Sequence, residues 1–172
     1  MWKFLFIILA LFNISGGKPM GIIVKSPAFS EGEFIPVEYT CDGEDISPEI
    51  LWSGAPAGTK SFVLIADDPD APIGLFTHWI VYDIPANISH LPENMPKVYE
   101  IDSIKQGIND FGRVGYGGPC PPPGKPHRYF FKVFALDIPT LGIPAGANRP
   151  IVEERMEGHI LAEGYLMGIY GR

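Results

Sequence analysis

Glycine and proline interrupt this chain along most of its length. The sequence holds 20 glycines and 18 prolines among 172 residues, nearly twice the share of roughly 12% in an average chain. Because proline removes a backbone donor and glycine weakens helices, this distribution excludes a helical bundle and a coiled coil. These residues are dispersed and 46% of the chain is hydrophobic, which disfavours a disordered low-complexity chain. The composition predicts a turn-rich β fold.

Short apolar runs bounded by turn residues predict the strands. The runs span residues 22–24, 34–40, 61–66, 76–84, 129–136 and 165–170. Pro36 in the second run cannot donate a hydrogen bond to a neighbouring strand, so we expect that run at the edge of a sheet. The run 129–136 (YFFKVFAL) carries apolar side chains on both faces, which is typical of a central strand that is covered on both sides.

The segment RPIVEERMEGHILAEG near the C-terminus has the periodicity of a helix. Val152, Met156 and Ile160 recur four residues apart, and glutamates occupy the opposite side. Asn148 precedes the segment and can cap its first turn, and Gly164 is the expected end. We therefore predict a β-rich domain with one late helix.

The charge of the chain limits the kinds of molecule that it can bind. The formal net charge is −7 at pH 7, and the lysines and arginines are scattered singly. Nucleic-acid-binding domains need a basic face, because neutralisation of phosphates supplies most of their affinity, and anionic membrane surfaces also attract basic clusters. The charge therefore disfavours both partners, although backbone amides and histidines can still bind a small anion in a local pocket.

The N-terminus has the features of a secretory signal peptide. Residues 4–12 (FLFIILALF) are all apolar, Lys3 precedes them, and the small residues Ser15 and Gly17 follow. Residues 1–19 are thus either a signal peptide, which predicts an exported protein, or a stretch before the true start at Met20, which predicts a cytoplasmic one. A membrane span needs about 20 apolar residues, so we expect no integral membrane segment in the mature domain, residues 20–172.

Cys41 and Cys120 are the two cysteines of the chain. Both fall in predicted loops without CxxC spacing, and two cysteines alone cannot form a structural zinc site. A disulfide between them and a pair of free thiols both remain open.

The densest polar feature is the segment DDPDAP at residues 67–72, which follows the run 61–66. Three carboxylates in four positions repel one another, so a cation, amide donors or a histidine should stabilise at least one of them. His78 opens the next predicted strand, ten residues after Asp68. The alternative is an Asp-Pro turn whose carboxylates cap local amides, with a histidine that only packs in the sheet.

A second feature is the loop GYGGPCPPPGKP at residues 115–126, which leads into His127. Glycines let a ligand approach the backbone, and prolines remove donors, so we expect Gly117 and Gly118 to carry most of the free amides of this loop. If the two strand ends are neighbours, His78 and His127 line one cleft with the aspartates. Imidazole N–H groups there can hold a phosphate or a carboxylate, while an aspartate fixes the tautomer. The alternative is a rigid surface turn without a ligand.

These segments resemble the signature motifs of the phosphatidylethanolamine-binding protein family, also called the Raf kinase inhibitor protein family. The motifs are DPDAP at 68–72, HW at 78–79 and GYGGPCPPPGKPHRYFF at 115–131. The flanking sequences YTCDGEDISPEILW (39–52) and MEGHILAEGYLMGIYGR (156–172) resemble the compact bacterial and archaeal branch. The resemblance runs from about residue 22 to the C-terminus.

The resemblance implies a mostly-β fold, in which a large central antiparallel sheet packs on a smaller sheet, with one or two short peripheral helices near the C-terminus. It also implies a small pocket for phosphate-like or carboxylate anions. The residues of that pocket, carried over by motif, are Asp68, Asp70, His78, Gly118, Pro119, His127 and Tyr129. Arg128 is expected to support the pocket rather than to touch the ligand.

The resemblance favours a non-enzymatic binding or regulatory module that needs no cofactor or metal. Its expected partners are a small anionic or phosphorylated ligand and possible protein partners, a kinase or a serine protease. The alternative is a serine protease inhibitor that acts through the rigid loop 118–126. The sequence has no GxSxG, HExxH or P-loop motif. A nucleophilic Cys120–His127 pair and a metal site on His78, His127 and an aspartate are the enzymatic alternatives.

Overall fold

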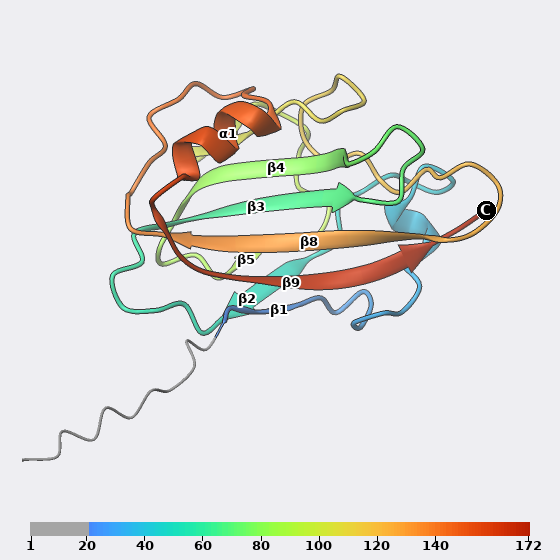
Figure 1. The fold of residues 1–172 in the computed structure, drawn as a ribbon, viewed down its shortest axis with the longest axis horizontal. Coiled ribbons are helices and arrows are strands. Elements are labelled where there is room, and N and C mark those ends of the chain that lie inside the picture. The colour runs from blue at the N-terminus through green and yellow to red at the C-terminus, as the bar shows by residue number, and fades with distance from the viewer. Residues whose placement is uncertain (1–20) are drawn as a thin grey trace, which may run out of the picture.

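The computed structural model describes residues 21–172, which form two antiparallel β-sheets and one α-helix (Figure 1). The elements are β1 (Ile23–Lys25), the 3-10 helix η1 (Val37–Tyr39), β2 (Ile50–Ser53), β3 (Ser61–Asp68), β4 (Phe76–Pro85), β5 (His90–Leu91), β6 (Glu100–Ile101), β7 (Ile104–Gln106), β8 (His127–Leu136), α1 (Arg149–Met156) and β9 (Ile160–Tyr170). The large sheet has the order β6-β7-β4-β3-β8-β9, and the small one β1-β2-β5. The predicted fold class is confirmed.

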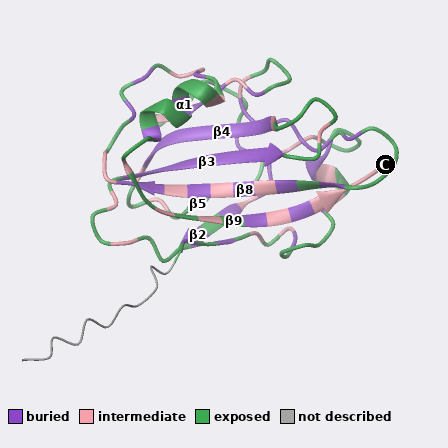
Figure 2. Ribbon diagram, in the orientation of Figure 1, coloured by how far each residue is buried: buried purple, intermediate pink, exposed green. Residues whose placement is uncertain are grey.

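Two hydrophobic cores lie on the two faces of the six-stranded sheet. One core, shared with the three-stranded sheet, contains Phe62, Leu64 and Ala66 of β3. The other contains Val63 and Ile65 of the same strand, together with α1 and the loop before it. Successive residues of β3 therefore enter different cores, and the whole strand is buried (Figure 2). This two-sided burial explains its uninterrupted apolar run.

β8 is a central strand, as predicted, because it lies between β3 and β9. Phe131 and Val133 are fully buried in the main core. Phe130 and Phe134, on the outer face, are only half-buried. The expected cover on both faces is thus incomplete here, since α1 lies over β3 and β4 instead (Figure 1).

The prediction of a strand over residues 34–40 is wrong. Phe34 forms only an isolated bridge to Ile169, and the chain then turns into η1, with Pro36 at its N-cap. Proline has no N–H for a strand ladder and its fixed φ suits the start of a helical turn. The Thr40 hydroxyl donates to the Val37 carbonyl, 2.8 Å away, and closes the turn.

The predicted late helix exists but ends eight residues before Gly164. Asn148 caps it as expected, by accepting a hydrogen bond from the Ile151 amide. The helix ends at Met156, and Ile160 begins β9, which pairs with β8 along its whole length. Long-range strand pairing thus overrides the helical periodicity of this segment. Gly164 lies inside β9, where an added Cβ atom would be 1.7 Å from the Ile22 carbonyl oxygen.

The predicted signal peptide, residues 1–19, lies outside the described residues. Within residues 21–172, no helix has the length and apolar character that a membrane span requires.

Candidate functional site

The strand register brings the two polar segments of the sequence to one end of the large sheet. β3 pairs antiparallel with both β4 and β8, so the end of β3 lies beside the beginnings of its two neighbours (Figure 1). Asp68 is the partner of Phe76 in β4, and Asp67 is the partner of Phe130 in β8. The two histidine-bearing strand ends are therefore neighbours of one carboxylate, which is the arrangement that a shared cleft requires.

A pocket of about 240 Å³ opens at this end of the sheet. Four of the seven predicted site residues line it: Asp68, His78, His127 and Tyr129. The remaining lining residues are Ala71, Pro72, Ile73, Phe76, Phe111, Cys120, Pro121 and Pro122. Sequence reasoning missed these apolar walls, although Pro72, Cys120 and the two following prolines stand inside the motifs that it identified. None of the described lining residues is a lysine or an arginine.

Asp68 fixes one of the two imidazole rings. Its Oδ2 atom lies 2.7 Å from Nδ1 of His127, and its carboxylate is almost fully buried. Its other oxygen accepts a hydrogen bond from the Asp70 amide at 2.7 Å. A buried carboxylate accepts from an N–H, so Nδ1 of His127 carries a proton and Nε2 is left for a ligand.

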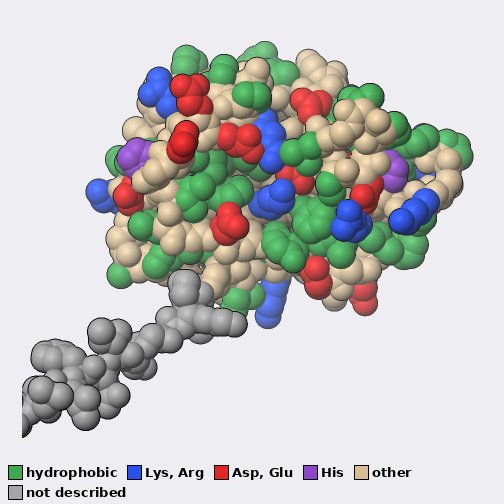
Figure 3. Space-filling model, viewed as in Figure 1, with side chains coloured by type: hydrophobic (Ala, Val, Ile, Leu, Met, Phe, Trp, Pro, Cys, Tyr) green, Lys and Arg blue, Asp and Glu red, His purple; other side chains and the backbone are tan. Residues whose placement is uncertain are grey.

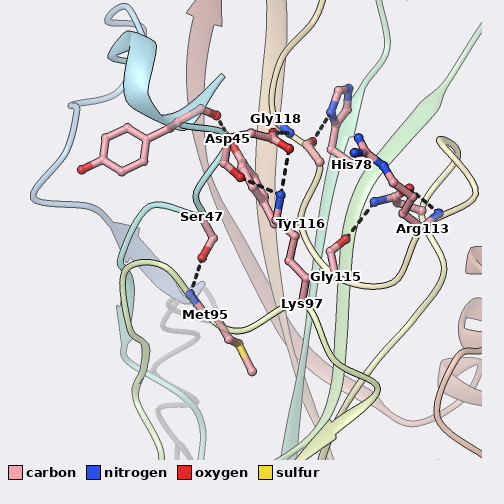
Figure 4. Close-up of polar contacts among 12 residues, drawn as sticks. Asp45, Ser47, His78, Met95, Lys97, Arg113, Gly115, Tyr116 and Gly118 are labelled. Carbon is pink, nitrogen blue, oxygen red and sulfur yellow. Dashed lines mark hydrogen bonds and ion pairs between the residues drawn. The ribbon is translucent and has the colours of Figure 1, made fainter. Parts of the chain in front are cut away.

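His78 is fixed by a backbone carbonyl. Its Nδ1 atom lies 2.6 Å from the Gly117 carbonyl oxygen (Figure 4), and a carbonyl can only accept, so Nδ1 is the donor. The ring packs against Phe76, Phe111 and Tyr129, with centroids 5.1 to 5.3 Å away. Burial among these rings lowers the pKa of His78. The ring is therefore neutral near pH 7, with an unprotonated Nε2.

Tyr129 contributes a buried hydroxyl that has no hydrogen-bond partner among the described residues. Its ring is 2% exposed and stacks against His127. Burial raises the pKa of Tyr129, so the hydroxyl keeps its proton. An unpaired buried hydroxyl costs free energy on the order of 1–3 kcal/mol, and a ligand in the pocket can remove that cost.

The structure places Gly118 and Pro119 with the neighbouring loop rather than on the pocket surface. The Gly118 amide donates to Oδ1 of Asp45 at 2.6 Å (Figure 4), and the Pro119 carbonyl accepts from the Cys41 amide. The Gly117 amide donates to the His78 carbonyl. The prediction that these glycines carry free amides is wrong, because folding uses both donors.

Asp70 also lies away from the pocket lining. Its carboxylate accepts hydrogen bonds from Nε and Nη2 of Arg128, at 2.9 and 2.8 Å, and from the Arg128 amide. The hydrogen bonds with this guanidinium lower the pKa of Asp70 to about 2. Arg128 thus supports the turn beside the pocket, as the resemblance implied.

Cys41 and Cys120 form a disulfide, with their Cα atoms 5.4 Å apart. The sequence left open whether these cysteines are a disulfide or a pair of free thiols, and the structure shows the disulfide. Because the disulfide removes the thiol of Cys120, the nucleophilic pair with His127 is not present in this form. Among residues 21–172, no group of three or more His, Cys, Asp or Glu side chains is arranged to hold a metal ion.

A larger groove, about 790 Å³, runs over the outer face of β8 and β9. Its buried carboxylate, Asp67, is already paired, since Oδ2 accepts from both Lys132 and Arg149 at 2.9 Å. On the side of the molecule seen in Figure 3, cations and carboxylates alternate in the same way. The smaller pocket is the better candidate, because two histidine rings and the unpaired Tyr129 hydroxyl line it together.

The comparison with known families decides the identity of the fold. Residues 25–171 match the model of the phosphatidylethanolamine-binding protein family. The chain belongs to this family. The resemblance seen in the sequence motifs is therefore confirmed.

Relatives of this phosphatidylethanolamine-binding protein family member occur in bacteria and archaea. The chain is 62% identical over 159 residues to a UPF0098 protein of Aquifex aeolicus, covering 92% of each. It is 48% identical over 170 residues to one of Pyrococcus horikoshii, covering 96% of this chain and 85% of the other.

Two solved structures have the same fold. A homolog of the family from Chlamydia trachomatis is 41% identical, with a TM-score of 0.80 over 88% of this chain and 98% of its own. YbcL of E. coli, described as a new member of the mammalian family, is 34% identical, with a TM-score of 0.82 over 88% of this chain and 99% of its own.

Proposed function

We propose that this protein is a non-enzymatic binding module whose pocket takes a small phosphate-like or carboxylate anion. One observation carries the proposal: His78, His127 and the unpaired Tyr129 hydroxyl line the same pocket. Family membership supports a ligand-binding role of this general kind. The pocket's volume of about 240 Å³ suits a phosphorylated head group or side chain, and it is too small to bury acyl chains as well.

A bound anion needs hydrogen-bond donors, and the tautomers of His78 and His127 determine which ring atoms can donate. Both Nδ1 atoms already donate within the protein, to Gly117 and to Asp68. Only Nε2 of each ring remains, and it donates only when the ring carries a second proton. The proposed ligand therefore binds together with protons, and Asp68 stabilises the resulting charge on His127. Tyr129 donates through its hydroxyl without a change of protonation.

The apolar walls strengthen these contacts. Phe76, Phe111 and the two prolines after Cys120 surround the polar atoms. Water is displaced when a ligand enters such a site, and hydrogen bonds to charged groups are stronger in the drier environment. This arrangement accounts for anion binding in a protein that is negatively charged as a whole.

An NMR titration of the four histidine rings with inorganic phosphate at pH 6.5 tests the proposal. The rings of His78 and His127 are expected to shift together and saturably, while His90 and His159, which lie outside the pocket, serve as spectators in the same sample. If all four rings shift alike, or none shifts, the pocket does not bind the anion.

Two variants separate binding from folding. His127→Asn places an amide donor near the position of Nδ1 and so keeps a partner for Asp68, but it deletes Nε2. Tyr129→Phe deletes only a hydroxyl that has no partner in the fold. We expect each variant to stay folded and to weaken phosphate binding by about tenfold, the loss of one charge-assisted or desolvated hydrogen bond. Unchanged affinity in both variants contradicts the proposed donors.

A second candidate function, inhibition of a serine protease, rests on the loop after Cys120. Residues 122–126 are exposed, and the disulfide and a Gly124 amide bond to the Arg172 carbonyl hold the loop at its two ends. A loop held in this way loses little entropy on docking. Inhibition of chymotrypsin-like or subtilisin-like proteases that survives His127→Asn supports this function over pocket-mediated binding, and its absence across both classes removes it.

The disulfide also bears on localisation. Structural disulfides form mainly in oxidising compartments, so we propose the exported form, with residues 1–19 removed as a signal peptide. Mass spectrometry of the protein isolated from its own cells tests this. A chain that retains residues 1–19 contradicts it, and so does a chain recovered from the cytoplasmic fraction of those cells.

A further inference from the structure

We propose that the Cys41–Cys120 disulfide is a thiol-exchange site that controls the pocket, so that its reduction by a dithiol weakens anion binding. The inference rests on the proposed function, because it concerns the affinity of the same pocket. Cys120 is itself a lining residue, together with Pro121 and Pro122. Both cysteines are exposed, so a dithiol reductant can reach the bond.

The pocket wall next to Cys120 has few other attachments. Residues 121–123 are all proline and have no backbone N–H to donate. Within the described chain, the backbone hydrogen bonds of this loop are at its ends, from the Cys41 amide to the Pro119 carbonyl and from the Gly124 amide to Arg172. Between these two points, the disulfide is the covalent cross-link that holds the wall in the described chain.

The rest of the site does not depend on the disulfide. The ring of His127 is held by Asp68, at the end of β3. The ring of His78 is held by Gly117, which lies in the same loop as Cys120 but is itself fixed to β4, because its amide donates to the His78 carbonyl. The two cysteine loops also stay attached to the chain end, because Arg172 forms an ion pair with Asp42 as well as accepting from Gly124. Reduction is therefore expected to loosen one wall while the fold and the two imidazoles remain.

The exchange itself is a two-electron reaction. A thiolate of the dithiol attacks one protein sulfur, and the S–S bond breaks to give a mixed disulfide and one cysteine thiol. The second thiol of the reductant then attacks the mixed disulfide and releases the other cysteine. The protein gains two electrons and two protons as two thiols, and the dithiol becomes a cyclic disulfide.

The loosened wall lowers the affinity for the anion, because ordering it on binding costs conformational entropy. In the oxidised form, Pro121 and Pro122 are already in place when the ligand enters. In the reduced form, binding must order the wall and exclude water at the same time, which lowers affinity without changing any contact. We expect reduction to weaken phosphate binding by about tenfold.

The test is the phosphate titration of the histidine rings in three samples: the oxidised protein, the protein reduced with dithiothreitol under anaerobic conditions, and the variant Cys41→Ser/Cys120→Ser. The reduced protein and the variant should bind about tenfold more weakly than the oxidised protein. Removal of dithiothreitol and reoxidation should restore the affinity of the wild type. The variant is the control for side effects of the reductant, because dithiothreitol should change nothing in it.

The outcomes distinguish this inference from the proposed function. Equal affinity of the oxidised and reduced proteins overturns the switch and leaves anion binding intact. The absence of any phosphate-dependent shift in the oxidised protein overturns the proposed function itself. Unfolding on reduction, seen as collapse of the spectator signals of His90 and His159, also overturns the switch, because the loss of binding is then global.

Discussion

The tautomers fixed in the pocket predict that anion binding depends steeply on pH. The Nδ1 atoms of His78 and His127 are both committed as donors, at 2.6 and 2.7 Å from their acceptors. An anion held by the two Nε2 atoms therefore requires at least one proton that the free protein does not carry near pH 7. His78 is the clearest case, because burial lowers its pKa.

The size of the change in affinity with pH follows from the number of protons that the pocket takes up with the anion. Uptake of one proton on binding changes the association constant about tenfold per pH unit, and uptake of two changes it about 100-fold. The sign is fixed by the charge, since a protonated ring favours the anion. Affinity should thus fall as the pH rises, by at least about 100-fold between pH 6.5 and 8.5.

Sulfate is the appropriate probe, because it stays a dianion throughout this range and adds no titration of its own. Its affinity can be followed by the ring signals of His78 and His127, with His90 and His159 as spectators, and checked by calorimetry in buffers of different ionisation enthalpy. His127→Asn should flatten the profile by one proton if His127 takes part. A sulfate affinity that stays within twofold from pH 6.5 to 8.5 refutes the reasoning, because neutral Nε2 atoms cannot donate.

Three further predictions concern stability. The disulfide joins residues 79 positions apart, so the entropy model gives about 4 kcal/mol for its loss in Cys41→Ser/Cys120→Ser and a fall in Tm of roughly 10–15 °C for a domain of this size; a calorimetric shift of only a few degrees contradicts that model. Gly164→Ala places a Cβ atom 1.7 Å from the Ile22 carbonyl oxygen, and urea unfolding should show a loss of about 3 kcal/mol as this contact is forced apart. Because burial holds the pKa of His78 below its ordinary 6.5, the unfolded chain binds the proton more readily, and the free energy of unfolding should fall as the pH drops below about 6.5. His78→Asn should remove that part of the pH dependence, and an identical profile in the variant argues against this role of burial.

Local patterns in the sequence indicated the fold class and the strands β1, β3, β4, β8 and the second half of β9, but not the short strands β2, β5, β6 and β7. The run at 61–66 lies within β3, and the run at 76–84 lies within β4. These patterns suffice because a strand that is buried on both faces must be apolar at nearly every position. The motifs around Asp68, His78 and His127 likewise identify the family on their own, and the match over residues 25–171 agrees with them.

Tertiary structure decided where elements end and which donors remain free. Ile160 continues a helical pattern, yet it begins β9, because pairing with β8 along ten positions outweighs local propensity. The Gly118 amide was expected to face a ligand, but it donates to Asp45, which is 73 residues away in the sequence. The family motif named Tyr129 as a pocket residue, but only packing shows that its hydroxyl has no partner.

The physical reason is the same in each case. Spacing along the chain fixes the period of a segment and therefore the faces it can present. A hydrogen bond between distant residues depends on the register of several strands at once. The sequence thus determined the chemistry available at this end of the sheet. Only the packing of β3 between β4 and β8 determined that His78, His127 and Tyr129 share one pocket with Asp68.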